Sequence, residues 1–400
     1  MYRNVTVACM GSRERYSLPV ALNKRGALKR LFTDIYIPYS VSSKLRNVSK
    51  NSAIKAFLNR SHEDLPCNLV SHKLLLGLMF RRKVRSAKNL SDRQDLLINY
   101  GSRFASFVSR SMPRSDLVLG YTGQALEFID VAKNQGSRVF IDQVDPGLHG
   151  WQVLKAESEK YAGWNNQIFS WSSDFQKRVE NELIHADKVV VNSDYSKKCI
   201  DAWIGENKSV ILPIPLTIQR KERLEINNKR PLRLLFLGGA SIGKGIQYAV
   251  IAVHNLLQKG YEVELIIAGE MLISCEKLSN YNGWFYIGSV ASNDIPSLLD
   301  SIDVLLFPTL SDGFGMVQTE AISRGVPVIS TMNCASVIEH GKSGFVMNEL
   351  SIECLQNYII RYHNDRELLK EHSRGAFIRS QEFEFNSYIK KVSEVLSISD

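Results

Sequence analysis

Two carboxylates, Asp312 and Glu320, bracket the stretch of sequence whose residue types are best suited to chemistry. An apolar run ends at Pro308, a polar loop carries Asp312, and a helix is predicted to begin near Gly315. Ligands of open α/β sheets bind at such a place, outside the carboxyl ends of the strands. A helix start suits a diphosphate, and the carboxylates suit sugar hydroxyls or a ribose diol. A helix with a well-capped first turn is the alternative explanation.

A second candidate is the glycine-rich turn around Lys244, which follows a predicted strand. The turn reads Gly238-Gly239-Ala240-Ser241-Ile242-Gly243-Lys244-Gly245. It nearly matches the phosphate-binding loop G-x-x-x-x-G-K-S/T, but Gly245 stands where the hydroxyl that holds Mg²⁺ would be. A lysine after such a turn can still neutralise a diphosphate without a metal. An exposed lysine on a tight turn is the alternative, and a P-loop NTPase is a distant rival.

The elements that must position these residues alternate between apolar runs and amphipathic stretches, which predicts α/β architecture with parallel sheets. In the first half we expect strands near Val5–Cys9, Leu31–Ile35, Leu117–Gly120, Val139–Asp142, Lys188–Asn192 and Val210–Pro213. In the second half we expect strands near Leu232–Leu237, Val263–Ala268, Trp284–Ile287, Val304–Phe307, Val326–Ser330 and Phe345–Val346. Helical periodicity lies between these runs, and residues 40–115 suggest short helices. The second half therefore has the pattern of a self-contained doubly wound domain.

The chain has 400 residues, which is enough for two domains. We expect a first domain over residues 1–216, a charged linker over 217–231 and a second domain over 232–375. Residues 376–400 form the last segment, in which Phe385–Leu396 has a helical, amphipathic pattern, and we expect this helix to pack back on the first domain.

The composition is that of an ordinary globular protein, with 44% hydrophobic and 23% charged residues. No stretch approaches the ~20 apolar residues that span a membrane. The six cysteines are scattered and form no C-x-x-C pair. A zinc site or a disulfide framework is therefore not expected, and a reducing cytoplasm is the predicted location.

The net charge of +9 is concentrated at one end of the chain. Residues 1–100 hold 19 Lys and Arg against 6 Asp and Glu, whereas the other 300 residues hold 31 against 35. Such asymmetry indicates an anionic partner, and a solvated basic face is the alternative. In residues 73–88 an apolar cluster runs into a basic one, as in an interfacial anchor on an anionic membrane. A buried helix with a basic end is weighed equally, so peripheral contact with the inner face of a membrane stays open.

Taken together, these segments resemble the retaining glycosyltransferases of family 4, also called group 1. That family's pattern is similar to F-x-G-R-x-x-x-x-K-G followed by E-G-F-G-x-x-x-x-E-A. The matching segments here are Phe236-Leu237-Gly238, Lys244-Gly245, Asp312-Gly313-Phe314-Gly315, Glu320-Ala321 and Gly325-Val326-Pro327. Weaker likenesses are Tyr286–Val290, Ile338–Val346 and His185–Ser193. The resemblance implies the GT-B architecture, in which two Rossmann-like doubly wound domains face each other across a cleft.

The resemblance also implies a role for each matching residue. Lys244 would contact the donor diphosphate, Asp312 the transferred sugar, and Glu320 the ribose. The other donor-binding positions would be Gly313, Phe314 and Gly315 along the sugar, Thr319 near the phosphates, Ile287 and Val290 beside the base, and Gly238 and Gly239 in the phosphate turn. In the first domain, Gly11 and Ser12 are expected in the loop that faces the donor.

Several positions depart from the family pattern. The family's arginine falls at Gly239, so half of its basic phosphate clamp is missing, and Asp312 is one methylene shorter than the usual glutamate. The family often has a histidine after the strand that here ends at Asp142. We expect Asp145 or Asp142 to face the cleft instead, with His149 as a weaker candidate. A plain turn at Asp145-Pro146-Gly147 is the alternative.

The function that the resemblance implies is that of a retaining, metal-independent hexosyltransferase of glycan biosynthesis. It would move a sugar from a nucleotide sugar to a glycan, lipid-linked or small-molecule acceptor, with no further cofactor. Substitution would occur on the front face, with Lys244 and a helix N-terminus stabilising the diphosphate leaving group. A nucleotide-sugar epimerase of the same fold and a non-catalytic nucleotide-sugar-binding protein are the alternatives. No metal site and no nucleic-acid partner are expected.

Overall fold

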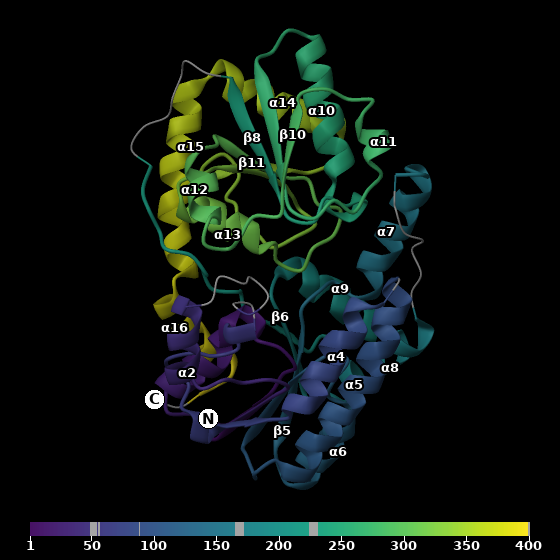
Figure 1. Ribbon diagram of the computed structural model, residues 1–400, viewed down its shortest axis with the longest axis vertical. Coiled ribbons are helices and arrows are strands. Elements are labelled where there is room, and N and C mark those ends of the chain that lie inside the picture. The colour runs from purple at the N-terminus through teal and green to yellow at the C-terminus, as the bar shows by residue number, and fades with distance from the viewer. Residues whose placement is uncertain (49–53, 55–56, 88, 165–171, 224–230, 399–400) are drawn as a thin grey trace.

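The computed structural model describes residues 1–48, 54, 57–87, 89–164, 172–223 and 231–398. They form two α/β units, one above the other in Figure 1, each built around its own sheet. The expected charged linker 217–231 lies partly outside the described residues. So do Lys88, in the basic stretch, and residues 399–400 at the end of the chain.

Within the described residues, the first sheet has seven parallel strands in the order β3-β2-β1-β4-β5-β6-β7. The strands are β1 (Val5–Ala8), β2 (Leu28–Thr33), β3 (Val70–His72), β4 (Leu117–Tyr121), β5 (Arg138–Gln143), β6 (Lys188–Val191) and β7 (Ser209–Ile211). The helices around it are α1 (Ser17–Lys24), α2 (Tyr39–Val48), α4 (Leu74–Arg85), α5 (Leu90–Ser111), α6 (Leu126–Asn134), α7 (Leu148–Lys160), α8 (Ser173–His185) and α9 (Asp194–Ile204). Two short 3-10 helices, η1 (Arg13–Tyr16) and η2 (Cys67–Leu69), precede α1 and β3.

Both faces of this first sheet are covered, which explains why its central strands are apolar without alternation. Every residue of β1 and of β4 is buried. One face packs Phe32, Phe104 and Phe128 into a cluster with α5 and α6. The other face packs Val7 and Leu22 into a second cluster with α1.

The second sheet has six parallel strands among the described residues, in the order β10-β9-β8-β11-β12-β13. The strands are β8 (Leu232–Leu237), β9 (Val263–Ala268), β10 (Trp284–Gly288), β11 (Val304–Phe307), β12 (Val328–Thr331) and β13 (Gly344–Met347). The helices are α10 (Ile246–Gln258), α11 (Cys275–Leu278), α12 (Ile295–Asp300), α13 (Met316–Ser323), α14 (Ile352–Asn364) and α15 (Arg366–Arg379), with η3 (Ile242–Lys244) before α10.

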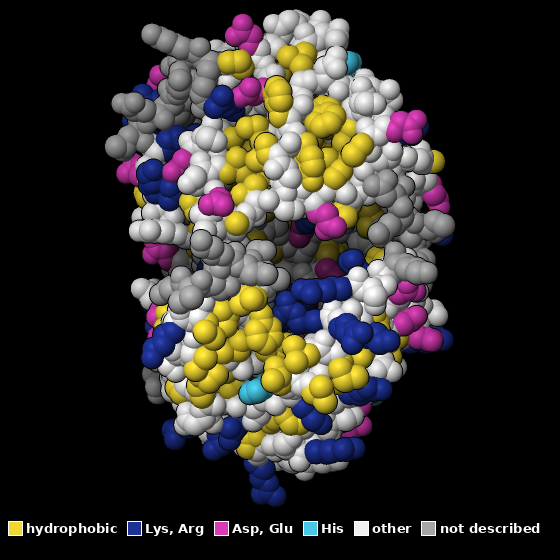
Figure 2. Space-filling view, in the orientation of Figure 1, with side chains coloured by type: hydrophobic (Ala, Val, Ile, Leu, Met, Phe, Trp, Pro, Cys, Tyr) yellow, Lys and Arg dark blue, Asp and Glu magenta, His cyan; other side chains and the backbone are white. Residues whose placement is uncertain are grey.

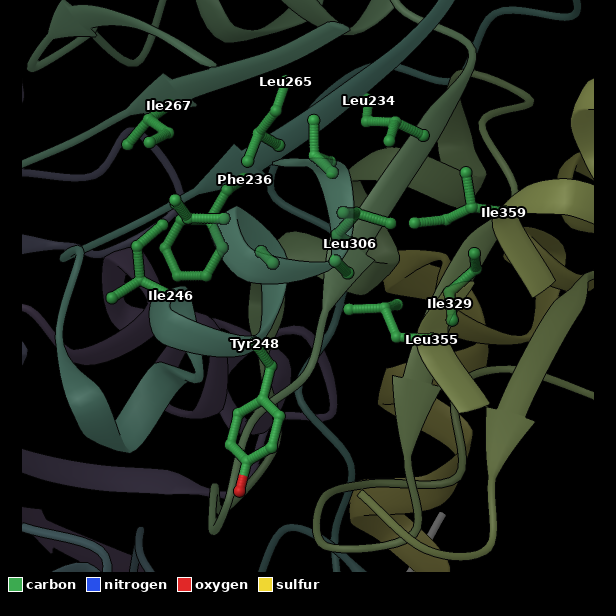
Figure 3. Close-up of a cluster of buried hydrophobic side chains, with 14 of the residues drawn as sticks. Leu234, Phe236, Ile246, Tyr248, Leu265, Ile267, Leu306, Ile329, Leu355 and Ile359 are labelled. Atoms are coloured by element: carbon green, nitrogen blue, oxygen red, sulfur yellow. The ribbon is translucent and has the colours of Figure 1, made fainter. Parts of the chain in front are cut away.

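A dry core lies between this second sheet and α10 and α14. Figure 3 shows Leu306 of β11 near Ile359 of α14, and Phe236 of β8 beside Ile246 of α10; all four side chains are buried. Tyr248 of α10 differs, because its hydroxyl points away from the cluster and donates to Glu157 Oε1 of α7 at 2.7 Å. Helix α7 of the first unit is joined to this core by that hydrogen bond and by Leu154, which packs against the same cluster.

The chain crosses back to the first unit at its end. After η4 (Ser380–Phe383), helix α16 (Phe385–Val395) packs on α1, and its Tyr388 and Val392 join the core of the first unit. Figure 1 shows α16 beside the two chain termini, below the second unit.

The parallel α/β pattern predicted from the sequence is confirmed, and each predicted strand overlaps an observed one. The expectation of short helices over residues 40–115 is wrong for α5, which has 22 residues. Strand β3 was not predicted. It is three residues long and lies at the edge of the sheet, where a half-exposed Val-Ser-His segment gives no apolar run.

Candidate functional site

Two loops of the second unit are joined at the carboxyl edge of its sheet. Gly245 has a φ of +76°, and a Cβ at this position would lie 1.9 Å from the carbonyl oxygen of Pro308. The Leu310 amide donates to the Gly243 carbonyl at 3.0 Å, and the Thr309 hydroxyl donates to the same carbonyl at 3.2 Å. The glycine-rich turn after β8 and the loop after β11 therefore form one structure, which only a glycine at 245 permits.

This junction brings Lys244 and Asp312 together. Lys244 Nζ forms an ion pair with Asp312 Oδ2 and also lies 5.5 Å from the centre of the Phe307 ring. The second carboxylate oxygen of Asp312 accepts the amide of Phe314 at 3.2 Å. The lysine is about two-fifths exposed, whereas the aspartate is mostly covered. A cation is thus held at the helix start and stays accessible to a ligand.

Glu320 lies on α13, the helix that follows the Asp312 loop, and is partly buried. Its Oε1 accepts the Thr217 hydroxyl at 3.1 Å. Burial raises the pKa of the Glu320 carboxyl, while that hydrogen bond and the charge of Arg15 oppose the rise. Thr319, next along the helix, is buried and donates its hydroxyl to the Met316 carbonyl at 2.8 Å. The structure therefore does not bring the Thr319 side chain into the site.

The three residues of the Gly-Phe-Gly segment have different surroundings. Phe314 is buried and packs edge-on against Phe383. Gly315 is buried with a φ of +74° and starts α13. Gly313 lies against the first unit, since a Cβ there would be 2.0 Å from the Val144 carbonyl oxygen. Their backbone, and not their side chains, forms this wall of the site.

Three glycine loops meet beyond Lys244, at the ends of β8, β9 and β10. Gly238 has a φ of +130°, and a Cβ on Gly269 would be 1.9 Å from the Gly238 oxygen. The Gly269 amide donates to the Gly288 carbonyl at 2.8 Å. Beside this junction, Ile287 is 49% exposed on the edge strand, while Val290 packs into a buried cluster. Gly269 was not singled out from the sequence, although Ala268–Gly269 ends a predicted strand.

The first unit faces these loops with a strained turn. Gly11, with a φ of +100°, donates its amide to Asp34 Oδ1 at 2.8 Å. The turn continues through Glu14, Arg15 and Tyr16, whose φ values are 41°, 54° and 65°. A left-handed conformation costs a non-glycine residue roughly 1–2 kcal/mol, so three in succession indicate a shape that the surroundings impose.

The strained turn places Arg15 on the wall of a cavity of about 820 Å³ between the units. Ser12 and Arg15 line it from the first unit, and Ser292 and Asn293 line it from the second. The Arg15 side chain is exposed, and no hydrogen bond or ion pair of its guanidinium occurs among the described residues. Sequence reasoning missed Arg15, because only the turn gives it this position.

Asp145 occupies the turn after β5 and serves first as a turn former. Its Oδ1 accepts the Gly147 amide and the Gln143 side-chain amide, both at 2.8 Å. Asp145 as a whole residue is exposed to solvent. Protein atoms nevertheless surround its carboxyl group closely, and this local burial raises the pKa of the carboxyl. Asp312 raises that pKa further, while Arg13 lowers it. Asp145 is therefore a turn residue whose carboxyl lies within range of the charge of Asp312 from the second unit.

Further titratable groups lie behind Asp145. Burial raises the pKa of Asp142 well above its usual range, with the charge of Glu14 adding to the rise and that of Arg13 opposing it. Asp142 and Glu14 share the wall of a small cavity with Tyr388 of α16. His149 lies outside this group, exposed and edge-on to the Tyr195 ring at 6.1 Å.

Direct contacts hold the two units together around the site. The Tyr195 hydroxyl donates to Ser311 Oγ at 3.0 Å, just before Asp312. Figure 2 shows the molecule hollowed at its waist between the units. Across residues 1–398, apart from the gaps given above, no group of His, Cys, Asp and Glu is placed to hold a metal ion, and no helix is long and apolar enough to cross a bilayer.

Two parallel doubly wound units whose glycine loops face each other across a waist define the GT-B class of fold. The Anabaena protein HepE in complex with UDP-glucose has the same fold, with a TM-score of 0.61 at 15% identity over 99% of this chain and 100% of that one.

Residues 218–378, about two fifths of the chain, match the family described as "Glycosyl transferases group 1". An uncharacterized 41.2 kDa protein in the cps region of Klebsiella pneumoniae is 30% identical over 240 residues, which cover 55% of this chain and 65% of that protein. The capsular polysaccharide biosynthesis glycosyltransferase CapM of Staphylococcus aureus is 25% identical over 142 residues, or 33% and 37% of the two chains. The matches thus span less than two thirds of either of these relatives.

Proposed function

We propose that the protein transfers a sugar from a nucleotide sugar to a hydroxyl acceptor with retention of anomeric configuration. The observation that carries the proposal is the ion pair of Lys244 with Asp312 at the carboxyl edge of the second sheet, with Glu320 on the helix that follows and the charge of Arg15 from the first unit acting on it. The match of residues 218–378 to a family of glycosyl transferases supports it, as does the UDP-glucose bound to HepE. We expect the donor to be a UDP-hexose.

Each residue then has one task. Lys244 binds the donor diphosphate, and the backbone of Gly238, Gly239 and Gly313 approaches the donor closely. Glu320 binds the ribose, and Ile287 lies beside the base. In the absence of donor, the ion pair with Asp312 holds Lys244 at the helix start, and donor binding exchanges this partner for the diphosphate while Asp312 turns to the sugar hydroxyls.

Arg15 supplies the second positive charge of the site in this proposal. The family's arginine is replaced by Gly239, and the Gly238–Lys244 turn offers no other cation. Arg15 stands across the cavity from that domain, with its charge close enough to lower the pKa of Glu320. The strain of three left-handed residues is consistent with a turn that is held for function.

The reaction forms a bond between the anomeric carbon and the acceptor oxygen, on the face that the leaving group departs from. The bond between that carbon and the diphosphate oxygen breaks, with both electrons going to the diphosphate. The acceptor's proton passes to a diphosphate oxygen. Lys244 and Arg15 stabilise the charge that develops on the diphosphate, and Asp145 faces the transferred sugar.

We also place the reaction in the cytoplasm. The six cysteines, Cys9, Cys67, Cys199, Cys275, Cys334 and Cys354, are all free, which agrees with a reducing compartment.

The proposal is tested by thermal shift against a panel of nucleotide sugars. One donor is expected to raise the melting temperature, because a ligand that binds only the folded state stabilises it. Glu320→Ala is expected to abolish that rise, whereas Glu371→Ala, an exposed glutamate on α15, leaves it unchanged. The proposal is wrong if no nucleotide sugar stabilises the protein, or if Glu320→Ala binds the donor as the wild type does.

A further inference from the structure

Helices α4 and α2 of the first unit both expose an unusual amount of apolar surface. On α4, Leu74, Leu75, Leu78 and Met79 are between 43% and 70% exposed, and Val41 and Leu45 of α2 are about half exposed. Figure 2 shows apolar side chains gathered on this part of the first unit, with Lys and Arg side chains next to them at the waist. A contiguous apolar area with a basic margin indicates contact with an anionic, apolar surface.

A cavity of about 600 Å³ opens where this apolar area meets the basic residues. Its apolar lining consists of Ile54, Phe57 and Leu78. The remaining lining residues are Arg81, Arg82, Arg85 and Ser86 from the end of α4. Such a cavity combines a wall for a hydrocarbon with several donors for an anion, and it has no acidic residue in its lining.

Arg81 is the residue of this cavity to which we expect a ligand to bind. Its Nη1 atom is buried and has no hydrogen-bond partner in this cavity wall or elsewhere among the described residues. The charge of Asp34 acts on Arg81, but no bond joins the two side chains among the described residues, and Asp34 Oδ1 accepts from Arg60 at 3.0 Å and from Gly11 at 2.8 Å. Burial, Arg60 and Arg85 all lower the pKa of Arg81. A buried donor without a partner among crowded cations is satisfied best by an oxyanion.

The cavity adjoins the turn that faces the donor. Gly77 of α4 packs so closely on Asp34 that a Cβ would lie 3.1 Å from its Cβ atom, and Asp34 in turn holds the Gly11 amide. Arg60 Nη1 is also close to Gly11, at 3.7 Å from the position of a Cβ there. An anion on Arg81 would therefore lie next to the acceptor side of the proposed active site.

We propose that this cavity binds the phosphate of a lipid-linked acceptor, in which a saccharide is joined through phosphate to a hydrocarbon chain. Arg81 and Arg85 bind the phosphate, the chain lies over Phe57 and Leu78 toward the membrane, and the saccharide reaches the Gly11 turn. The proposal rests on the proposed glycosyl transfer for the role of the ligand as acceptor. Binding of the lipid phosphate itself does not depend on the donor.

The test is flotation of the full chain with three kinds of vesicle. They contain phosphatidylcholine alone, phosphatidylcholine with phosphatidylglycerol, or phosphatidylcholine with a long-chain isoprenyl phosphate at the same surface charge. We expect the isoprenyl phosphate vesicles to bind about tenfold more protein than the phosphatidylglycerol vesicles. A hydrogen bond from a charged donor to a bound phosphate contributes roughly tenfold or more in binding, so Arg81→Gln and Arg85→Gln are each expected to remove much of this preference.

A matched control removes the same charge elsewhere. Arg110→Gln and Arg114→Gln change exposed arginines around the end of α5, and we expect them to leave the preference unchanged. Melting curves check that each variant is folded. Because Arg85 is exposed, its replacement tests the site even if Arg81→Gln unfolds the protein. Equal binding to both anionic vesicles, or wild-type binding by Arg85→Gln, would overturn the proposal.

Two further arms separate the possible failures. If inorganic phosphate or glycerol phosphate stabilises the wild type as strongly as isoprenyl phosphate does, the ligand is a small anion and the lipid assignment is wrong. Donor binding is measured on the wild type by thermal shift. Lipid phosphate binding without any donor binding contradicts the proposed function, whereas donor binding without lipid preference contradicts only this inference.

Discussion

Burial of the Glu320 carboxyl is expected to determine the pH range in which the protein binds its donor. The pKa of this carboxyl is raised above the ordinary value of 4.5, chiefly by burial. A carboxylate accepts two ribose hydroxyls, whereas the protonated acid loses part of that capacity. We expect donor affinity to be full above the raised pKa and to fall as the pH drops through it. Calorimetric titration of donor over a pH series measures this.

The control for the pH effect is Glu320→Gln, which keeps the shape of the side chain and cannot titrate. Its donor affinity is expected to be weaker than that of the wild type at neutral pH and flat across the same series. A wild-type profile as flat as that of Glu320→Gln contradicts the assignment of Glu320 to the ribose.

The charge across the cavity can be tested at Arg15. Loss of one donor to a developing negative charge typically costs 10²–10³ in rate, so we expect Lys244→Gln to lower kcat by about 100-fold. Arg15→Gln is expected to lower kcat in the same direction, by about tenfold, because its guanidinium is exposed. Initial-rate kinetics with the donor found by thermal shift give both values. Arg114→Gln is the control. A rate for Arg15→Gln equal to that of this control would contradict the proposal that Arg15 stabilises the leaving diphosphate.

The site residues differ in how far the sequence could predict them. Lys244, Asp312 and Glu320 stand beside glycines at loop and helix starts, and that pattern is visible in the sequence. Arg15 is not predictable in this way, because the three successive left-handed residues Glu14, Arg15 and Tyr16 include no glycine. The burial of Thr319 also depends on the rotation of α13 against its neighbours, which is a tertiary property.

At the scale of elements, the contact between the turn after β8 and the loop after β11 leaves the least room for a side chain. Gly245 and Gly260 flank the same helix, α10, with φ values of +76° and +85°. A Cβ on Gly245 would meet the Pro308 oxygen at 1.9 Å, whereas nothing lies within 4 Å of one on Gly260. Gly260→Ala should cost about 1 kcal/mol in left-handed strain. Gly245→Ala should cost at least about 2 kcal/mol more, from overpacking.

Denaturant unfolding of both variants gives this comparison. Because the two positions share the same backbone strain, the difference between them isolates the contact with Pro308. Equal losses in the free energy of unfolding would mean that the two loops separate easily, and donor binding should then survive in Gly245→Ala. We expect instead that Gly245→Ala loses more stability than Gly260→Ala and binds the donor more weakly.

The elements themselves were predictable where the physics is local. The strands Leu232–Leu237, Val263–Ala268 and Val304–Phe307 are apolar runs of parallel strands buried on both faces, and their predicted bounds are those observed. Helix α5 was not predicted as one element, since its buried face carries Gln94, Tyr100 and Gly101 among polar neighbours. Its length is set by packing along α6 and α8, which the sequence does not display.

At the scale of the whole molecule, the waist is held by a few close contacts between the units. Besides the bond from Tyr195 to Ser311, the carbonyl of Val144 approaches Gly313 so closely that only a hydrogen fits between them. The charged groups proposed for donor and acceptor lie on opposite sides of this contact. The distance between the units therefore decides whether the acceptor can reach the donor.

Gly313→Ala tests this relation between the units. The residue needs no left-handed backbone, so alanine is compatible with its own loop, and the clash is with Val144 of the other unit, at 2.0 Å. We expect both units to stay folded but to move apart, with a larger radius of gyration in solution scattering. Misplacing reactants by about 1 Å can cost roughly 100-fold in rate, so transfer should fall strongly. Donor binding should fall by less, because Lys244 and Glu320 are unchanged.

Gly243→Ala is the matched control for this variant. Its Cβ would also point at the first unit, but it would meet the flexible end of Leu154 at 2.9 Å, and that side chain can move aside. We expect its scattering and its rate to be close to those of the wild type. If Gly313→Ala transfers sugar as fast as Gly243→Ala does, the spacing of the two units does not control the reaction. If Gly313→Ala instead loses donor binding and transfer together, Gly313 acts through the donor loop itself, and the waist contact only accompanies the fold.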